Sequence, residues 1–571
     1  MGQIVNPGNA AFQRKALNGK IYVDKTGLLN ITNEVIDTPD NLICNSRPRR
    51  FGKTVTANML SAYYCRTCDS ENLFHGLEIS QNPDFKKYLN QYDVIYWDMQ
   101  WCIDLANGPE NLLSYLTTTT IQELKEYYPD IKSSTVTGAL SDIYQSTGRG
   151  FVVIIDEWDV LVRDYTTHTQ LVDSYINFLR GMFKGSGPDT YIHLAYMTGI
   201  LPIKRAKTQS SLNNFKERTM LDPGVLAPYI GFTENEVQTL CKKYQRDFQQ
   251  VKRWYDGYLL DGYHVYNPVA VVSVLTERSG FKSYWSATGS YEAVDSAITI
   301  DFDGLKTSII NMLAGEYVDV DITRFSNDPA KFKSKDDVIT YLIHLGYLGY
   351  NGKAFVPNEE IRQELSNAVS ETKWAEYLDL LKESKSLLTA TLNGDVAKVA
   401  KVFDKVHSDV TSVIQYNDEN SLSSVVYLAY LGITQYYYKP ERERPTGKGF
   451  ADLIYFPKPE YKHDYPVLLI ELKWNKDAQT AITQIHDRHY PDSLKDYTDD
   501  ILLVGINYNK DTKEHECIIE KYKEKEESEH ITDSQRTQIL TFHDIGVSDD
   551  NIARGLSLPI KAVRAVLDKK K

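Results

Sequence analysis

Apolar runs in the first 230 residues alternate with segments of helical periodicity. The runs cover residues 41–45, 93–97, 151–155 and 191–196, and each carries few charged side chains. A strand buried on both faces is continuously apolar, and such strands alternate with helices in parallel sheets. The pattern predicts an α/β domain over residues 1–230, with a parallel sheet covered by helices on both faces.

The remaining residues show three further patterns. Residues 231–400 have mainly helical periodicity, broken by aromatic and Asn-Pro punctuation, and predict a helical lid or connecting domain. Residues 401–520 combine a long helix, strands, a second helix and a further strand, which predicts another α/β domain. The charged run at 521–529 is typical of a solvated linker. Residues 530–571 predict a small tail of three short helices.

The composition is that of a multidomain globular protein. A chain of 571 residues exceeds what one hydrophobic core holds and predicts roughly three to four domains. No apolar run approaches the about 18–20 residues of a membrane span, and no secretory signal is visible at the N-terminus. We therefore expect a cytoplasmic protein that has no membrane partner.

Charge and cysteine spacing exclude two further classes. The net charge of −13 argues against a protein that coats nucleic acid with its whole surface, although it allows a local basic groove. Cys65 and Cys68 form the one CxxC, and no second pair lies at zinc-site spacing. We therefore expect reduced thiols rather than a structural zinc site.

A phosphate-binding loop is indicated by the string SRPRRFGKT at residues 46–54, which follows the apolar run at 41–45 and precedes a helical pattern. In such a loop Lys53 reaches the β- and γ-phosphates, and the Thr54 hydroxyl ligates Mg²⁺. Backbone N–H groups around Gly52 cradle the β-phosphate. One departure is Arg47, which stands where the full pattern has glycine.

Acidic residues follow the apolar run at 151–155, at the edge where open α/β sheets bind ligands. Asp156 fits an Mg²⁺-anchoring role, and Glu157 fits the base that orients a hydrolytic water. Thr198 ends a later strand, where it could sense the γ-phosphate. Arg205 and Arg218 are candidate transition-state arginines.

An acid and a lysine lie two residues apart in the apolar run at 467–473, namely Glu471 and Lys473. Side chains at i and i+2 of a strand share one face, and burying both charges is costly unless they are paired or bind an ion. Asp452 begins another apolar strand that can return as a hairpin. Two carboxylates and a lysine on adjacent strands predict a site for Mg²⁺ and a phosphate; the alternative is an edge strand with an exposed ion pair.

The motifs of the first 290 residues are similar to those of the AAA-ATPase-like family of bacterial P-loop proteins. The resemblance rests on Tyr22-Val-Asp-Lys-Thr26, the string at 46–54, Ile155-Asp-Glu157, Ser211-Leu-Asn-Asn214, Tyr255-Asp-Gly-Tyr258 and Tyr266-Asn-Pro268. It implies ATP binding by residues of the loop and the sheet edge: Arg50, Phe51, Gly52, Lys53, Thr54, Asp156 and Thr198. It also explains Arg47 as family usage.

Residues 410–510 resemble the PD-(D/E)XK nuclease domain that is commonly fused to that ATPase. The resemblance implies that Asp452 and Glu471 hold Mg²⁺ and that Lys473 positions or polarises the attacking water and the scissile phosphate. Gln484, with Tyr490, matches the accessory motif on the following helix. A fourth acid is either Glu419, on a predicted helix at 417–436, or Glu443. Residues 551–563 resemble a helix-turn-helix unit, for which a packing hairpin is the alternative.

Two sites for phosphate chemistry in one chain predict an ATP-dependent or ATP-gated, Mg²⁺-dependent nuclease. We expect it to act on DNA, with a role in defence or mobile-element control. The sequence leaves open whether the protein forms a homo-oligomer. The alternative is a regulatory ATP-binding switch whose nuclease-like domain binds nucleic acid or protein without cleaving. A small-molecule kinase would need a site that activates an acceptor, which we do not find.

Overall fold

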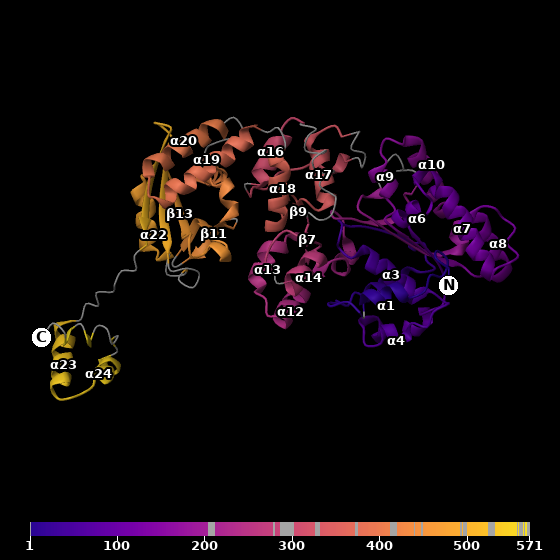
Figure 1. Cartoon of the computed structure of the whole chain (residues 1–571), viewed down its shortest axis with the longest axis horizontal. Coiled ribbons are helices and arrows are strands. Elements are labelled where there is room, and N and C mark those ends of the chain that lie inside the picture. The colour runs from indigo at the N-terminus through magenta and orange to yellow at the C-terminus, as the bar shows by residue number, and fades with distance from the viewer. Residues whose placement is uncertain are drawn as a thin grey trace.

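The structure is a computed structural model. It describes residues 2–16, 18–203, 212–277, 280–285, 302–313, 315–325, 332–371, 375–410, 419–438, 440–446, 449–490, 494, 500–522, 532–556, 558, 563–564 and 566–567. Figure 1 shows a mainly helical region between two sheet-containing bodies, with two helices of the C-terminal tail apart from them. The domain boundaries at 1–230, 231–400, 401–520 and 530–571 stay predictions.

The N-terminal body is built on a parallel sheet of five strands in the order β2-β3-β4-β1-β5. Their bounds are β1 (Leu42–Ser46), β2 (Asp93–Asp98), β3 (Phe151–Asp156), β4 (Ile192–Gly199) and β5 (Lys216–Arg218). The four predicted strands and their parallel pairing are confirmed. The fifth strand was not foreseen, because its Lys-Glu-Arg sequence carries no apolar signal.

Helices cover both faces of this sheet, as expected. Alternate residues of one strand, such as Val152 and Val153, enter the two different hydrophobic cores on either side. The helix that follows the phosphate-binding string, α3 (Lys53–Tyr64), packs on β3 and β4. The other helices are α1 (Ala10–Ala16), α2 (Leu28–Val35), α4 (Glu71–Phe74), α5 (Phe85–Tyr88), α6 (Met99–Leu105), α7 (Leu112–Tyr127), α8 (Val136–Thr147), α9 (Val160–Asp164), α10 (Thr169–Phe183) and α11 (Pro188–Tyr191).

The middle region is mainly helical, which confirms the expectation. Its helices are α12 (Glu234–Tyr244), α13 (Phe248–Tyr255), α14 (Pro268–Thr276), α16 (Leu305–Leu313), α17 (Lys335–Leu345), α18 (Glu359–Glu371) and α19 (Ala375–Leu392). Local signals set their starts: Thr233 and Glu236 form a capping box for α12, and Asn267 caps α14 ahead of Pro268. Small sheets of β6 (Phe232–Thr233), β7 (Tyr258–Leu260) and β8 (Tyr263–Tyr266), and of β9 (Gly349–Tyr350) and β10 (Ala354–Phe355), were missed.

The second α/β body holds a mixed sheet in the order β11-β12-β13-β14-β15. The strands are β11 (Glu441–Thr446), β12 (Gly449–Tyr455), β13 (Val467–Trp474), β14 (Ile501–Asn509) and β15 (Glu514–Lys521). The β12–β13 hairpin is antiparallel, as predicted, and β13 runs parallel to β14. The helices are α20 (Val396–Val410), α21 (Glu419–Ala429) and α22 (Ala478–Asp487). The single helix predicted at 417–436 is wrong, because α21 gives way to a 3₁₀ helix at Leu431–Gln435.

The tail contains α23 (Asp533–Asp544) and α24 (Asp549–Leu556), as expected. A capping box of Thr532 and Gln535 starts α23, and Ile539 and Ile552 belong to a small core of its own. Most of the predicted third helix lies outside the described residues. In the part of the chain that the structure describes, no helix is long and apolar enough to cross a membrane.

Candidate functional site

The string at 46–54 forms a tight loop between β1 and α3. Arg50 and Gly52 have φ of 69° and 92°, so the backbone turns through the left-handed region twice before the helix begins. Gly52 is the N-cap of α3 and contributes no side-chain bond to the first N–H groups of the helix. These N–H groups face the loop, which is the arrangement that binds phosphate at a helix N-terminus.

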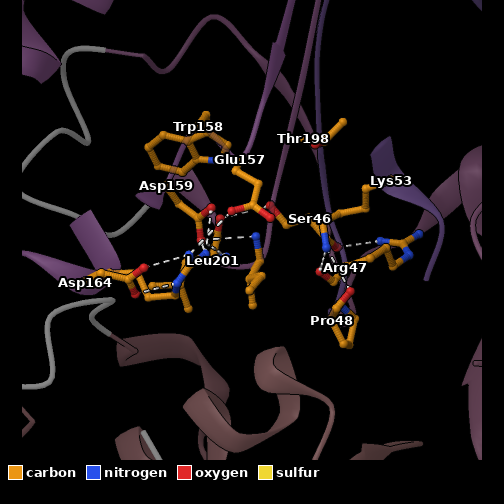
Figure 2. A network of polar contacts seen from close by, with 12 residues as sticks. Ser46, Arg47, Pro48, Lys53, Glu157, Trp158, Asp159, Asp164, Thr198 and Leu201 are labelled. Atoms are coloured by element: carbon orange, nitrogen blue, oxygen red, sulfur yellow. Dashed lines mark hydrogen bonds and ion pairs between the residues drawn. The ribbon is translucent and has the colours of Figure 1, made fainter. Parts of the chain in front are cut away.

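Lys53 folds back onto this loop. Its Nζ donates hydrogen bonds to the carbonyl oxygens of Arg47 and Pro48, at 2.9 and 2.8 Å (Figure 2). The side chain is 7% exposed, and this burial lowers the pKa of Lys53 to about 8, against the opposing effect of Asp156 and Glu157. A phosphate that binds Lys53 must therefore replace two carbonyl oxygens of the loop as the hydrogen-bond acceptor of its ammonium group.

An acidic turn follows β3 at the same edge of the sheet. Asp156 is buried and accepts hydrogen bonds from the Thr198 hydroxyl and, at 3.1 Å, from the backbone N–H of Glu157. Glu157 has a φ of 53° and lies 3.7 Å from Arg163. Burial raises the pKa of Glu157, while Arg163 and then Lys53 lower it. The loop lysine and both acids thus share one electrostatic environment.

The other predicted acids lie on the β12–β13 hairpin. Leu453 pairs with Ile470, so one further step of the antiparallel register places Asp452 opposite Glu471, on the same face. Glu471 is 1% exposed and accepts a hydrogen bond from Lys473 Nζ at 3.0 Å. The predicted shared face of Glu471 and Lys473 is confirmed. Asp452 lies inside its strand rather than at its start, and it accepts the backbone N–H of Leu472 at 2.7 Å.

Comparisons with known proteins match two separate parts of the chain. Residues 7–208 match a family model described as predicted AAA-ATPase, and residues 417–518 match the PD-(D/E)XK nuclease superfamily. The chain thus carries an AAA-ATPase-like domain and a PD-(D/E)XK nuclease superfamily domain. It is 22% identical over 506 residues to an uncharacterized protein in the vnfD 5′ region of Azotobacter chroococcum mcd 1, covering 86% of this chain and 93% of that one.

A solved structure of the Aeropyrum pernix ORC2 protein, in ADPNP-ADP complexes, is also similar to this chain. The two are 10% identical with a TM-score of 0.20, over 74% of this chain and 90% of the ORC2 chain.

Arg47 stands at the position where the full loop pattern has glycine. The side chain is completely buried, and its Nη1 donates to the carbonyls of Ser46, at 2.9 Å, and Arg218, at 3.3 Å. The side chain therefore extends toward β5, the strand that carries Arg218. Burial lowers the pKa of Arg47 to about 10. Arg218 itself pairs with Asp222 at 3.5 Å, and Arg205 lies outside the described residues.

A third acid in the ATPase domain was missed. Asp159 is buried and accepts the backbone N–H groups of Ile200 and Leu201 at 3.1 and 2.9 Å. It thereby ties the turn after β3 to the turn after β4 (Figure 2). Arg163 lies 3.4 Å from Asp159 and also reaches Glu157. The signal in the sequence was the closely spaced acids of Asp156-Glu-Trp-Asp159.

An apolar cavity of about 270 Å³ lies beside the first turn of α3. Its walls come from four separate segments: residues 12–25, the phosphate-binding loop with α3, residues 229–232 and the start of α14. Tyr22, Val55 and Phe232 are among the side chains that form it. Sequence reasoning missed this cavity, because no single segment forms it.

Gln484 lies on α22, the helix that follows β13. Its Nε2 donates to Glu471 and, at 3.3 Å, to the Tyr490 hydroxyl. Gly505 in β14 allows α22 to pack closely on the sheet, because a Cβ at that position would lie 2.6 Å from the Ala478 carbonyl in α22. Burial raises the pKa of Tyr490, and the charges of Glu471 and Asp452 raise it further. Both carboxylates are therefore close to this tyrosine.

The fourth acid of the nuclease-like site is not decided. Glu419 begins α21, and the β11–β12 register places Glu443 opposite Asp452, but both side chains lie outside what the structure describes. Within the described ranges, no three His, Cys, Asp or Glu side chains form a group that could hold a metal ion. Asp452 and Glu471 nevertheless supply the carboxylate oxygens that suit Mg²⁺, which keeps several water ligands.

Proposed function

We propose that this protein is an ATP-gated, Mg²⁺-dependent nuclease that acts on DNA. The observation that carries the proposal is the presence of two separate buried arrangements in one chain, Lys53 with Asp156 and Lys473 with Glu471. Each lies within one of the two matched domains. A cytoplasmic role in defence or mobile-element control is the biological context we expect.

In the ATPase domain, Lys53 leaves its two loop carbonyls and binds the phosphates. Thr54 and Asp156 would hold Mg²⁺, and Thr198, already bonded to Asp156, would lie near the γ-phosphate. Glu157 is the base that orients water, and Arg163 holds it at the sheet edge. The apolar cavity beside α3 is the right kind of site for the nucleobase.

In the nuclease-like domain, Asp452 and Glu471 would hold Mg²⁺, which lowers the pKa of bound water and stabilises charge on the phosphoryl oxygen. Lys473 lies 3.0 Å from Glu471, so it can donate to the same phosphate or water. Gln484 fixes the orientation of Glu471 through its side-chain amide. These residues position and polarise the reacting groups.

The ATPase step is tested with purified full-length chain. Lys53→Ala should abolish ATP hydrolysis and weaken nucleotide binding, because the phosphates lose their buried cation. Lys20→Ala changes an exposed lysine and serves as the matched control. Equal hydrolysis by wild type and Lys53→Ala would remove the loop from the proposal.

The nuclease step is tested by incubating the protein with plasmid, Mg²⁺ and ATP. Wild type should cut the plasmid and Asp452→Ala should not. Asp464 is an exposed acid in the connection between β12 and β13, and Asp464→Ala should cut the plasmid normally. Absence of cleavage of any nucleic acid, under conditions where ATP is hydrolysed, contradicts the proposal.

A second candidate is a regulatory ATP-binding switch whose nuclease-like domain binds nucleic acid or protein without cleaving. It is favoured by the contacts of Glu471, whose Oε1 is bonded to both Lys473 and Gln484. A carboxylate held in this way needs rearrangement before it binds a metal. If Lys473→Ala leaves the cellular phenotype intact, this candidate is preferred.

A further inference from the structure

Helix α18 begins with two adjacent buried carboxylates. Glu359 and Glu360 are 3% and 1% exposed, and both lie in the first turn of the helix. Asn358 starts the helix by accepting the N–H of Ile361 at 2.9 Å. Adjacent helical residues point about 100° apart, so the two carboxylates reach different neighbours.

Glu359 contacts the nuclease-like domain. Arg362 of the same helix donates to both of its oxygens, at 3.0 and 2.6 Å. Lys458, in the connection directly after β12, lies 3.7 Å from Glu359 and is 5% exposed. The Lys458 ammonium also lies 5.6 Å from the ring of Trp254. A buried charge cluster of this kind holds its members at fixed positions, because separating them leaves an uncompensated charge.

Glu360 lies on the side of the ATPase loop. It accepts the backbone N–H of Tyr284 at 2.7 Å. Burial raises the pKa of Glu360 to about 8, and the hydrogen bond from Tyr284 lowers it; a smaller lowering comes from the charge of Arg50 in the phosphate-binding loop. The same loop is in direct contact with the middle region, since a Cβ on Gly346 would lie 2.8 Å from Pro48.

Direct packing also connects the loop to α18. The Phe51 and Tyr258 rings meet edge to face at 5.4 Å, and the Tyr258 hydroxyl donates to the Gly346 carbonyl at 2.5 Å. Gly257, with a φ of 118°, lies so close to Pro357 that a Cβ would be 2.1 Å from its carbonyl oxygen. Pro357 leads directly into α18, so a continuous series of contacts connects the phosphate-binding loop to this helix.

We propose that Glu359 and Lys458 are positioning residues that transmit nucleotide occupancy of the phosphate-binding loop to β12, the strand that carries Asp452. The inference rests on the proposed ATP binding. When phosphates take Lys53 from its two loop carbonyls, the loop must rearrange against Tyr258 and α18. Lys458 is bound to α18 and follows β12, so the rearrangement reaches the strand. Both residues lie outside the phosphate-binding loop and outside the pair Asp452 and Glu471.

The test is amide hydrogen exchange of the full-length chain with and without a non-hydrolysable ATP analogue and Mg²⁺. In wild type, exchange in the peptide covering 449–458 should change by about fivefold or more on nucleotide binding, the lower end of usual allosteric coupling. Lys458→Met should lose this change and keep nucleotide affinity. Lys458→Arg keeps the positive charge that Lys458→Met removes, so it should show the same change in exchange as wild type. A purely structural role of Lys458 does not predict this recovery.

Two matched controls complete the design. Lys462→Met changes an exposed lysine in the same connection and should respond like wild type. Gly257→Ala should lose the response, whereas Gly262→Ala, with a φ of 82° and nothing within 4 Å of its Cβ, should keep it. A normal response in Lys458→Met, or no response in nucleotide-bound wild type, overturns the inference. Failure of wild type to bind nucleotide overturns the proposed function instead.

Discussion

Raising the pH should weaken ATP binding, because Lys53 must bind phosphate as an ammonium. Burial lowers its pKa to about 8, although the charges of Asp156 and Glu157 raise it. The lysine is therefore mostly charged at neutral pH and loses its proton as the pH rises through 8. A phosphate ligand has its last pKa at about 6, so its own charge changes little over the same range.

The size of the effect follows from the protonated fraction. With a pKa of about 8, about 90% of Lys53 is protonated at pH ~7 and about 10% at pH ~9. The Kd for ATP and Mg²⁺ should therefore rise about tenfold between these two pH values, equivalent to about 1.4 kcal/mol. Binding should also take up protons near the midpoint of this range.

Calorimetric titration in buffers of different ionisation enthalpy measures both the Kd and the proton uptake. Lys53→Arg is the control, because arginine stays charged over this pH range. The Kd of this variant should not change with pH, whatever its absolute value. A wild-type Kd that does not change with pH, in protein whose circular dichroism is unchanged, refutes the reasoning. A pH slope retained in Lys53→Arg refutes it equally.

Three further predictions concern other residues of the two sites. Glu157→Gln should lower kcat for ATP hydrolysis by about 10²-fold or more without weakening nucleotide binding, as measured by phosphate release and titration. Gly505→Ala should lower the free energy of unfolding by about 1–3 kcal/mol in urea denaturation, since its Cβ would lie 2.6 Å from Ala478; Gly555→Ala, with open space around it, should not. Asp452→Asn should abolish the rise in Tm that Mg²⁺ produces in wild type, and an equal rise in both proteins contradicts a metal role for Asp452.

Local sequence patterns predicted the parts of the fold that local physics determines. The apolar runs became β1 to β4 because strands buried on both faces need continuous apolar side chains. The face shared by Glu471 and Lys473 followed from the alternation of a strand alone. The polar strand β5 could not be recognised in this way, because only its pairing with β1 makes it a strand.

Contacts between distant segments could not be predicted from one sequence. Lys458 meets Glu359 across the boundary of two predicted domains, and no periodicity relates the two positions. Asp159 is close to Asp156 in the sequence, but its role depends on where β4 ends. The role of Arg47 likewise depends on its neighbour β5, which supplies the carbonyl that its guanidinium binds.

The central claim is that chemistry at Glu471 depends on nucleotide at Lys53. Plasmid cleavage with Mg²⁺, compared with and without ATP in wild type, Lys53→Ala and Asp452→Ala, tests it most directly. Among these reactions, we expect cleavage only by wild type in the presence of ATP. Neither variant should cut the plasmid. Cleavage by Lys53→Ala equal to that of wild type, or ATP hydrolysis by wild type without any cleavage, would contradict the claim.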